Sequence, residues 1–119
     1  EIVTLGGAAM EGQFFTTHYA PDIATPEARK FIEAYRARYG AIPDDVAALT
    51  YDAFGMLFQA IQQAGSADRE AIRNALAQIT EYTGVTGTMS FRGSGDPEKT
   101  AVVLQIQEGE FRYYGSAAP

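Results

Sequence analysis

The chain has 119 residues, a formal net charge of −6 and no cysteine. Its acidic balance, without a run of Lys or Arg, argues against nucleic acid or an anionic membrane surface as the main partner. The lack of cysteine excludes a disulfide framework, a thiolate metal site and a cysteine nucleophile. No apolar run approaches the ~18 residues of a membrane span and no signal peptide opens the chain, so we expect a soluble domain whose export signal would lie outside this sequence.

The beginning of the chain predicts one strand and no metal or catalytic site. Residues 1–12 are rich in glycine and other small residues and predict a loop. Residues 13–19 are aromatic and β-branched and predict a strand. His18 is the only histidine, and no second His, Cys or suitably spaced carboxylate accompanies it. We therefore expect His18 to be an ordinary residue at a strand end, and we predict neither a metal nor a cofactor.

The longest apolar segment, residues 43–65, predicts a long helix around which the rest of the chain is organised. Pro43, Asp44 and Asp45 suit the first turn of a helix, and Gly65 suits a left-handed cap at its end. Apolar residues occupy most of the circumference of this helix. Such a helix must be covered on several sides.

Two shorter amphipathic helices are expected on either side of the long one. The segment 25–40 begins with Thr25 as N-cap and Pro26 in the first turn, and its aromatic residues recur at helical spacing. Its charged residues lie off the apolar face and predict a solvated surface with intrahelical ion pairs rather than a binding patch. These residues are Arg29, Lys30, Glu33, Arg36 and Arg38. A third helix opens at residues 66–68 and carries Ile72, Ala75, Leu76 and Ile79 on one face.

The last part of the chain changes to the periodicity of strands. Residues 85–91 alternate, and residues 92–97 predict a turn. Residues 100–106 are almost continuously apolar, which is typical of a strand covered on both faces. Glu108-Gly109 predicts a hairpin turn, and the small residues after Tyr114 are expected to fray. One strand, three helices and several further strands predict an α/β fold.

The order of these segments resembles a known family. Its most specific parts are Tyr39-Gly40, Pro43 and Tyr51-Asp52-Ala53 in the helical region, and the hairpin from Gly84 to Pro97. With the segments around them, from about Gly6 to Phe111, they resemble the C-terminal third of the Leu/Ile/Val-type periplasmic binding proteins of bacterial ABC transporters. The resemblance implies an α/β fragment of the two-lobed type I fold, with three helices followed by a β-hairpin and C-terminal strands.

The same resemblance implies that the chain is divided between two lobes. Residues 13–19 and 101–114 would be strands of the C-terminal lobe, and residues 25–91 would supply helices and a strand to the N-terminal lobe. The hinge crossings would lie near residues 19–24 and 95–100. Because family members are much longer, neither lobe would be complete within this chain.

The resemblance also locates candidate ligand contacts. In this family the amino and carboxylate groups of the ligand are held mainly by residues from the first two-thirds of the protein, so this chain alone is not expected to bind. The part of the pocket that maps here is the start of the long helix, with Val46 or Ala47 as an apolar wall and Tyr51 one turn on. The residues themselves leave another interpretation open, in which Val46 and Ala47 are core and Tyr51 is a buried tyrosine that bonds with Asp52 or the hinge.

The function implied is that of a binding protein and not an enzyme. It would capture a branched-chain or related amino acid between its lobes, in the periplasm or outside the cell, and deliver it to an ABC transporter permease. Hinge closure requires no covalent chemistry, in keeping with the lack of a nucleophile, base or metal pattern. The alternative is a ligand-sensing domain of a receptor or regulator with the same fold. A hydrolase based on Asp44 and Asp45 is disfavoured, because adjacent helical residues point about 100° apart.

The apolar surface of the chain also predicts self-association. The long helix is apolar on too many sides for two short helices and a few strands to cover. Phe14, Phe15 and the strand 101–106 require further neighbours as well. We therefore expect an intertwined or strand-paired dimer, or a higher oligomer.

Overall fold

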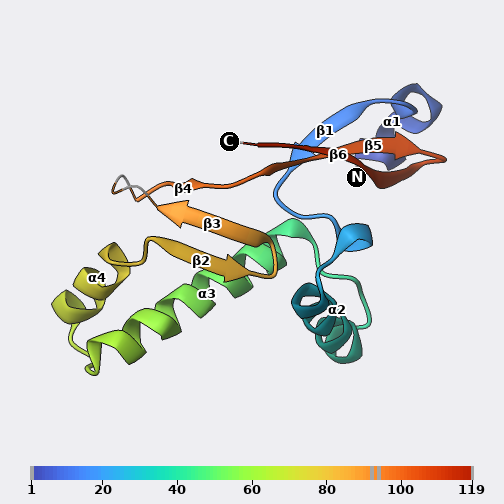
Figure 1. The fold of residues 1–119 in the computed structure, drawn as a ribbon. Coiled ribbons are helices and arrows are strands. Elements are labelled where there is room, and N and C mark those ends of the chain that lie inside the picture. The colour runs from blue at the N-terminus through green and yellow to red at the C-terminus, as the bar shows by residue number, and fades with distance from the viewer. Residues whose placement is uncertain (1, 92, 94, 119) are drawn as a thin grey trace.

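Two small antiparallel sheets joined by two links form the frame of the chain in the computed structural model, which describes residues 2–91, 93 and 95–118 (Figure 1). In chain order the elements are α1 (Ile2–Gly6), the 3-10 turn η1 (Gly7–Met10), β1 (Phe14–Thr17), the 3-10 turn η2 (Pro21–Ile23), α2 (Pro26–Tyr39), α3 (Asp45–Ala64), α4 (Arg69–Ala77), β2 (Glu81–Gly84), β3 (Gly87–Phe91), β4 (Pro97–Glu98), β5 (Ala101–Gln107) and β6 (Glu110–Ala117). The strand orders are β1-β5-β6 and β2-β3-β4. Figure 1 shows α3 running beside β2 and β3, with the β1-β5-β6 sheet on the far side of β4.

The β1-β5-β6 sheet has β5 as its central strand. The predicted hairpin turn is confirmed, since Glu108 and Gly109 have φ angles of 54° and 75°, the positive values that a two-residue type I′ turn requires. The prediction that the chain frays after Tyr114 is wrong for residues 115–117. These residues continue β6 because β5 begins early enough, at Ala101, to pair with them.

The two faces of β5 are not equally covered. Val102 and Ile106 are buried, whereas Val103 and Gln105 on the other face are only half-buried. The expectation of a strand covered on both faces is therefore wrong for this chain. Three short strands and one short N-terminal segment do not supply enough side chains to close both faces of the sheet.

The N-terminal segment is helical rather than a loop. The apolar residues of α1 precede the glycines that suggested an irregular segment, and η1 continues the turn. The side chain of Glu11 then accepts hydrogen bonds from the backbone N–H groups of Glu108 (2.8 Å) and Gly109 (3.2 Å). The segment thus fastens the β5–β6 hairpin turn.

The three main helices begin and end largely as predicted. Each N-cap side chain accepts a hydrogen bond from the backbone N–H three residues on, as such caps do. The pairs are Thr25 with Ala28, Asp44 with Ala47 and Asp68 with Ala71. Gly65 ends α3 with a φ of 59°, in the left-handed region. α4 ends at Ala77. Ile79 is therefore a buried residue of the segment that follows the helix, and not of the helix itself.

The second sheet contains a strand, β2, that was not predicted from the sequence, because the expected hairpin began only at Gly84. Glu81 pairs with Ser90 and Gly84 pairs with Gly87, so Val85 and Thr86 form the turn. The predicted strand had begun at Val85. The signal for β2 was weak because its residues alternate between exposed and half-buried, and only Tyr82 is large and apolar.

The buried side chains form two small clusters rather than one core. The first lies where α2, the start of α3 and the β2–β3 turn meet, and it contains Tyr19, Ala24, Ala28, Ala48 and Val85. The second lies between α3 and α4 and contains Ala60, Ala75 and Ile79. Val102 and Ile106 of β5 are buried outside both clusters. The radius of gyration is 16.8 Å, whereas a compact domain of this length has about 13.5 Å. The accessible surface is 8159 Å², against about 6,300 Å² for a compact protein of this mass. The chain is therefore elongated and exposes an unusually large surface.

Part of this surface is the apolar circumference of α3. Val46, Phe54 and Phe58 are more than half exposed, so the described part of the chain does not supply the covering that α3 requires on several sides. Within the described residues, none of the helices combines the length and the hydropathy needed to cross a membrane.

Candidate functional site

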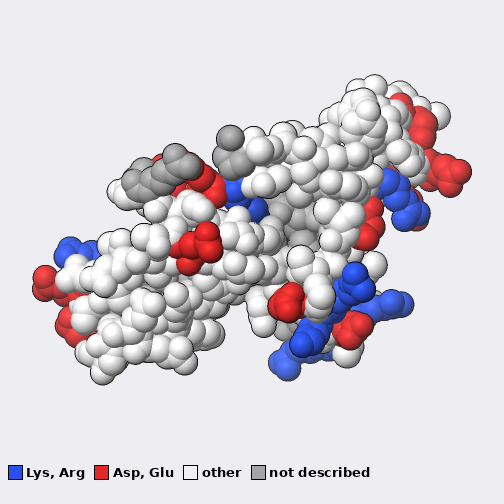
Figure 2. Space-filling model, viewed as in Figure 1, with Lys and Arg blue, Asp and Glu red and all other residues white. Residues whose placement is uncertain are grey.

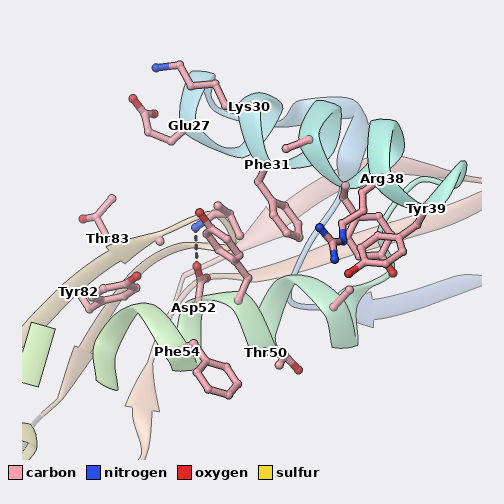
Figure 3. Close-up of a pocket in the computed structure, with 16 residues that line it drawn as sticks. Glu27, Lys30, Phe31, Arg38, Tyr39, Thr50, Asp52, Phe54, Tyr82 and Thr83 are labelled. Atoms are coloured by element: carbon pink, nitrogen blue, oxygen red, sulfur yellow. Dashed lines mark hydrogen bonds between the residues drawn. The ribbon is translucent and has the colours of Figure 1, made fainter. Parts of the chain in front are cut away.

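A hollow of about 970 Å³ lies between α2, the first half of α3 and the β2–β3 turn (Figure 3). We call it the groove. Figure 3 shows Phe31 reaching from α2 towards α3, with Arg38 and Tyr39 at one end and Tyr82 and Thr83 at the other. A hollow of this volume, apolar with a few polar groups, has the size of a small-molecule site.

Four aromatic rings form a continuous row along the groove. Phe31, Tyr35 and Tyr39 stand four residues apart on α2 and so share one face of that helix. The ring centroids are 4.6 Å apart for Tyr51 and Phe31, 5.9 Å for Phe31 and Tyr35, and 4.6 Å for Tyr35 and Tyr39. The guanidinium carbon of Arg38 lies 5.7 Å from the centre of the Tyr39 ring, within the range of a cation–π contact. The rings are tilted against one another by 40° to 56°, and the row offers a largely apolar wall with a positive charge at its end.

The surface of α2 beside the groove is basic although the chain as a whole is acidic. Figure 2 shows Lys and Arg side chains gathered over this helix. The ion pairs predicted within α2 do not form; in the described part of the chain, ion pairs join Arg73 to Glu70 and Arg112 to Glu110 instead. The charges of α2 are therefore a solvated surface without internal neutralisation.

The carboxylate of Asp52 forms the floor of the groove next to the β2–β3 turn. It accepts hydrogen bonds from the backbone N–H groups of Val85 (2.7 Å) and Thr86 (2.9 Å) and from the Thr86 hydroxyl (2.6 Å). Asp52 is only 1% exposed. Because its oxygens are already occupied by the turn, this carboxylate ties α3 to the hairpin rather than presenting acceptors to a ligand.

The predicted contact residues are brought together only in part. Ala47 and Tyr51 line the groove, whereas Val46 does not and is 66% exposed. The interpretation of Tyr51 as a buried tyrosine bonded to Asp52 is wrong, since Tyr51 is 54% exposed and stacks on Phe31. The interpretation of Val46 as a core residue is also wrong, because its side chain is exposed. Whether Val46, Ala47 and Tyr51 contact a ligand stays a prediction.

The side of the groove that α2 contributes was not predicted from the sequence. The aromatic residues of α2 were expected on the seam of an amphipathic helix, and their spacing of four residues was the signal for a row of rings. His18 is exposed, and its backbone carbonyl accepts a hydrogen bond from Lys99 (3.2 Å). Among the described residues, no group of three or more His, Asp or Glu side chains is placed to hold a metal ion.

Burial also affects Tyr19, beside the groove. Its hydroxyl is buried without a hydrogen-bond partner among the described residues, and this burial raises the pKa of Tyr19 from 10.0 to about 12. The Tyr19 phenol is therefore protonated at neutral pH and acts as part of the cluster with Ala24, Ala28 and Val85.

Comparisons with known proteins agree on one family. A family model described as periplasmic binding protein matches residues 1–110. A Leu/Ile/Val-binding protein homolog of Brucella suis is 27% identical over an alignment of 118 residues, and the alignment covers 95% of this chain and 31% of that protein. The chain thus spans about a third of the length of the curated relatives that it matches.

Solved structures give the same result. A leucine binding protein of Thermotoga maritima is 38% identical, with a TM-score of 0.89 over 99% of this chain and 34% of that one. A putative branched-chain amino acid ABC transporter protein of Rhodospirillum rubrum is 38% identical, with a TM-score of 0.75 over 94% of this chain and 33% of that one. A branched-chain amino acid substrate binding protein of Streptococcus pneumoniae, in complex with isoleucine, is 26% identical, with a TM-score of 0.83 over 98% of this chain and 34% of that one.

Proposed function

The chain belongs to the periplasmic binding protein family, with the α/β fold of its type I members, and we propose that it serves as part of a solute-binding protein of an ABC transporter. The observation that carries the proposal is the likeness to the leucine binding protein of Thermotoga maritima, at 38% identity over almost the whole chain. The ligand class we propose is a branched-chain or related amino acid, as in the printed descriptions of several relatives. The family acts in the periplasm or outside the cell, and we assign this chain to the same location and to a permease partner.

We also propose that the two sheets belong to different lobes. Residues 13–19 and 101–114 would belong to the C-terminal lobe and residues 25–91 to the N-terminal lobe, with crossings near residues 19–24 and 95–100. The separation of the β1-β5-β6 sheet from the β2-β3-β4 sheet supports this division. The elongated shape supports it as well, because two partial lobes do not share one core.

In this proposal the start of α3 forms one wall of the ligand cleft. Ala47 and Tyr51 line the groove, and Val46 stands on the neighbouring exposed surface of the same helix turn. Small side chains at positions 46 and 47 leave room for a bulky ligand. Ligand groups with charge would be held by segments that are found in the longer relatives.

A chimera tests the proposal directly. We would join this chain to the first two-thirds of the Thermotoga maritima leucine binding protein and titrate it with leucine, isoleucine, valine and alanine by calorimetry. The chain by itself should show no binding at micromolar strength, and the chimera should bind at least one branched-chain amino acid. Failure of a folded chimera to bind any member of the panel would contradict the function.

Substitutions in the chimera test the site separately. Val46→Phe and Ala47→Phe should weaken bulky ligands by about tenfold relative to alanine, since the added ring occupies their space. Phe58→Ala, in the second half of α3, is the control and should leave the ligand preference unchanged. Equal affinities of the Phe variants across the panel would remove these two residues from the cleft.

The exposed surface supports a second proposal, that the chain alone self-associates. Its surface exceeds that of a compact protein of this mass by about 1,800 Å², whereas each partner in a standard protein interface buries only about 800 Å². Light scattering at tens of micromolar should therefore give a mass well above 12.9 kDa. A monomeric mass would contradict this proposal.

A further inference from the structure

Lys99 lies at the shortest connection between the two sheets. β4 ends at Glu98 and β5 begins at Ala101, so Lys99 and Thr100 alone separate a strand of one sheet from a strand of the other (Figure 1). The other link starts at His18, directly after β1, and includes η2. This other link leads into α2, and its first residue, His18, lies within hydrogen-bond distance of Lys99.

The ammonium group of Lys99 contacts the first link and the second sheet. It donates hydrogen bonds to the backbone carbonyl of His18 (3.2 Å), to the backbone carbonyl of Thr86 (2.7 Å) and to the Thr86 hydroxyl (2.7 Å). An ammonium group has three protons, so these three acceptors match its whole capacity. One side chain from the second link thus holds the backbone of the first link and the β2–β3 turn.

Thr86 passes this connection on to α3. Because the ammonium can only donate, the Thr86 hydroxyl accepts from Lys99 and donates its own proton to Asp52, at 2.6 Å. Asp52 also holds the backbone of the turn through the N–H groups of Val85 and Thr86. We call Lys99, Thr86, Asp52 and the His18 carbonyl the clasp.

Charge supports the same arrangement. Lys99 is half-buried, and this burial lowers the pKa of its ammonium group, while the negative charge of Asp52 acts in the opposite direction. A partly desolvated ammonium needs well-placed acceptors, and hydrogen bonds from a charged donor are about twice as strong as neutral ones. The clasp provides these acceptors from two different parts of the fold.

We propose that Lys99 is a positioning residue that sets the orientation of the β1-β5-β6 sheet relative to α3 and the groove. A rotation of one sheet against the other about the two links changes the distance from Lys99 to His18, to Thr86 or to both. The clasp restrains that rotation, because its acceptors belong to the first link and to the β2–β3 turn. The role of this restraint in the closure of the two lobes around a ligand rests on the function proposed above, whereas the restraint itself does not.

The lack of cysteine in the native chain makes the orientation measurable. Gln63→Cys at the end of α3 and Thr16→Cys on β1 place two spin labels on exposed positions of the two units. Pulsed electron spin resonance then gives the distribution of distances between the labels. Dilution with excess unlabelled chain removes distances between molecules, and circular dichroism shows which variants are folded.

Three substitutions test the clasp. Lys99→Met keeps the length of the side chain but removes the donor, and it should broaden and shift the distance distribution. Thr86→Val removes the hydroxyl and should broaden it as well, whereas Thr86→Ser retains the hydroxyl and should restore the native distribution. Lys30→Met is the matched control, because Lys30 is the other lysine of the chain and lies on exposed α2.

The double variant separates a clasp from two independent effects. If Lys99 acts through Thr86, Lys99→Met combined with Thr86→Val should broaden the distribution no more than the stronger single variant. A native distribution in folded Lys99→Met would overturn the proposal, as would equal broadening in Lys30→Met. These measurements need no ligand, so a chimera that fails to bind amino acids leaves their outcome unaffected.

Discussion

Tyr51 and Asp52 are neighbours in α3, yet they belong to two regions that differ in completeness. Asp52 is 1% exposed, and its carboxylate is bonded to the β2–β3 turn. Tyr51 is 54% exposed, and its ring meets Phe31 across an open groove. Because successive helical residues point about 100° apart, one helix turn presents both environments. We call the hydrogen bonds between Asp52 and the β2–β3 turn the polar tie, and all its members lie within this chain. The aromatic groove, in contrast, is open to a further binding partner.

The two regions also differ in how strongly they hold the fold. Buried hydrogen bonds to a charged group contribute more than contacts between exposed rings, about 1.5–3 kcal/mol each against about 0.5–1.5 kcal/mol. Changes at the polar tie should therefore affect the free energy of unfolding most. Changes on the open surface should affect association instead.

The largest effect is expected for Asp52→Asn. The amide can accept from only part of the turn and directs its own N–H₂ group at donors, so the free energy of unfolding should fall by about 3 kcal/mol. Urea unfolding at low protein concentration measures it. Asp45→Asn, at an exposed acid in the first turn of the same helix, is the control and should cost about 0.5 kcal/mol. Equal losses in the two variants would show that the tie is not special.

A somewhat smaller effect is expected for Gly84→Ala. A Cβ atom at Gly84 would overlap the Asp52 carboxylate and push it away from the turn. We expect a loss of about 2 kcal/mol, typical of a forced shift in a packed site. Gly115→Ala in β6 is the matched control, because a Cβ atom there meets no other atom within 4 Å. A native-like stability of Gly84→Ala would mean that the tie can move without cost.

Substitutions on the open surface of α3 should change the self-association of the chain rather than its free energy of unfolding. Phe54 and Phe58 are 53% and 59% exposed, so replacing both with Ser removes apolar surface while disturbing little packing. Sedimentation velocity should show a shift towards the monomer with the free energy of unfolding nearly unchanged. Thr50→Ser, at an exposed position on the same helix, is the control. An unchanged distribution of species would place the self-association surface elsewhere.

The smallest effect at neutral pH is expected for Tyr19, because its contribution to stability changes only in alkaline solution. Its pKa is raised from 10.0 to about 12 in the folded chain, so the folded state keeps the proton more tightly than the unfolded state does. The contribution to stability is complete below pH 10 and is lost as the pH rises from 10 to about 12. Tyr19→Phe should remove this part of the loss of stability at alkaline pH. Because the pKa of Tyr82 is also raised, the difference between the native chain and Tyr19→Phe at each pH is the quantity to measure.

The candidate site could be predicted from the sequence only in part. Ala47 and Tyr51 were located through a resemblance that depends on the order of segments, and both line the groove. The row of rings was not predicted, since helical spacing places Phe31 on a face of α2 without saying which helix it meets. The role of Asp52 was not predicted either, because its partner Thr86 lies 34 residues away in the chain.

What the sequence determined by itself is everything that depends on residues close together along the chain. The caps at Thr25, Asp44 and Asp68 bond to residues three positions on, and the turn at Glu108-Gly109 follows from the conformational freedom of its glycine. The succession of such local signals was also sufficient to identify the family. Only the tertiary structure decided which side of α3 remains open, that the rings form a row, and that Lys99 joins both links. These features depend on packing between distant segments, for which a single sequence contains no local signal.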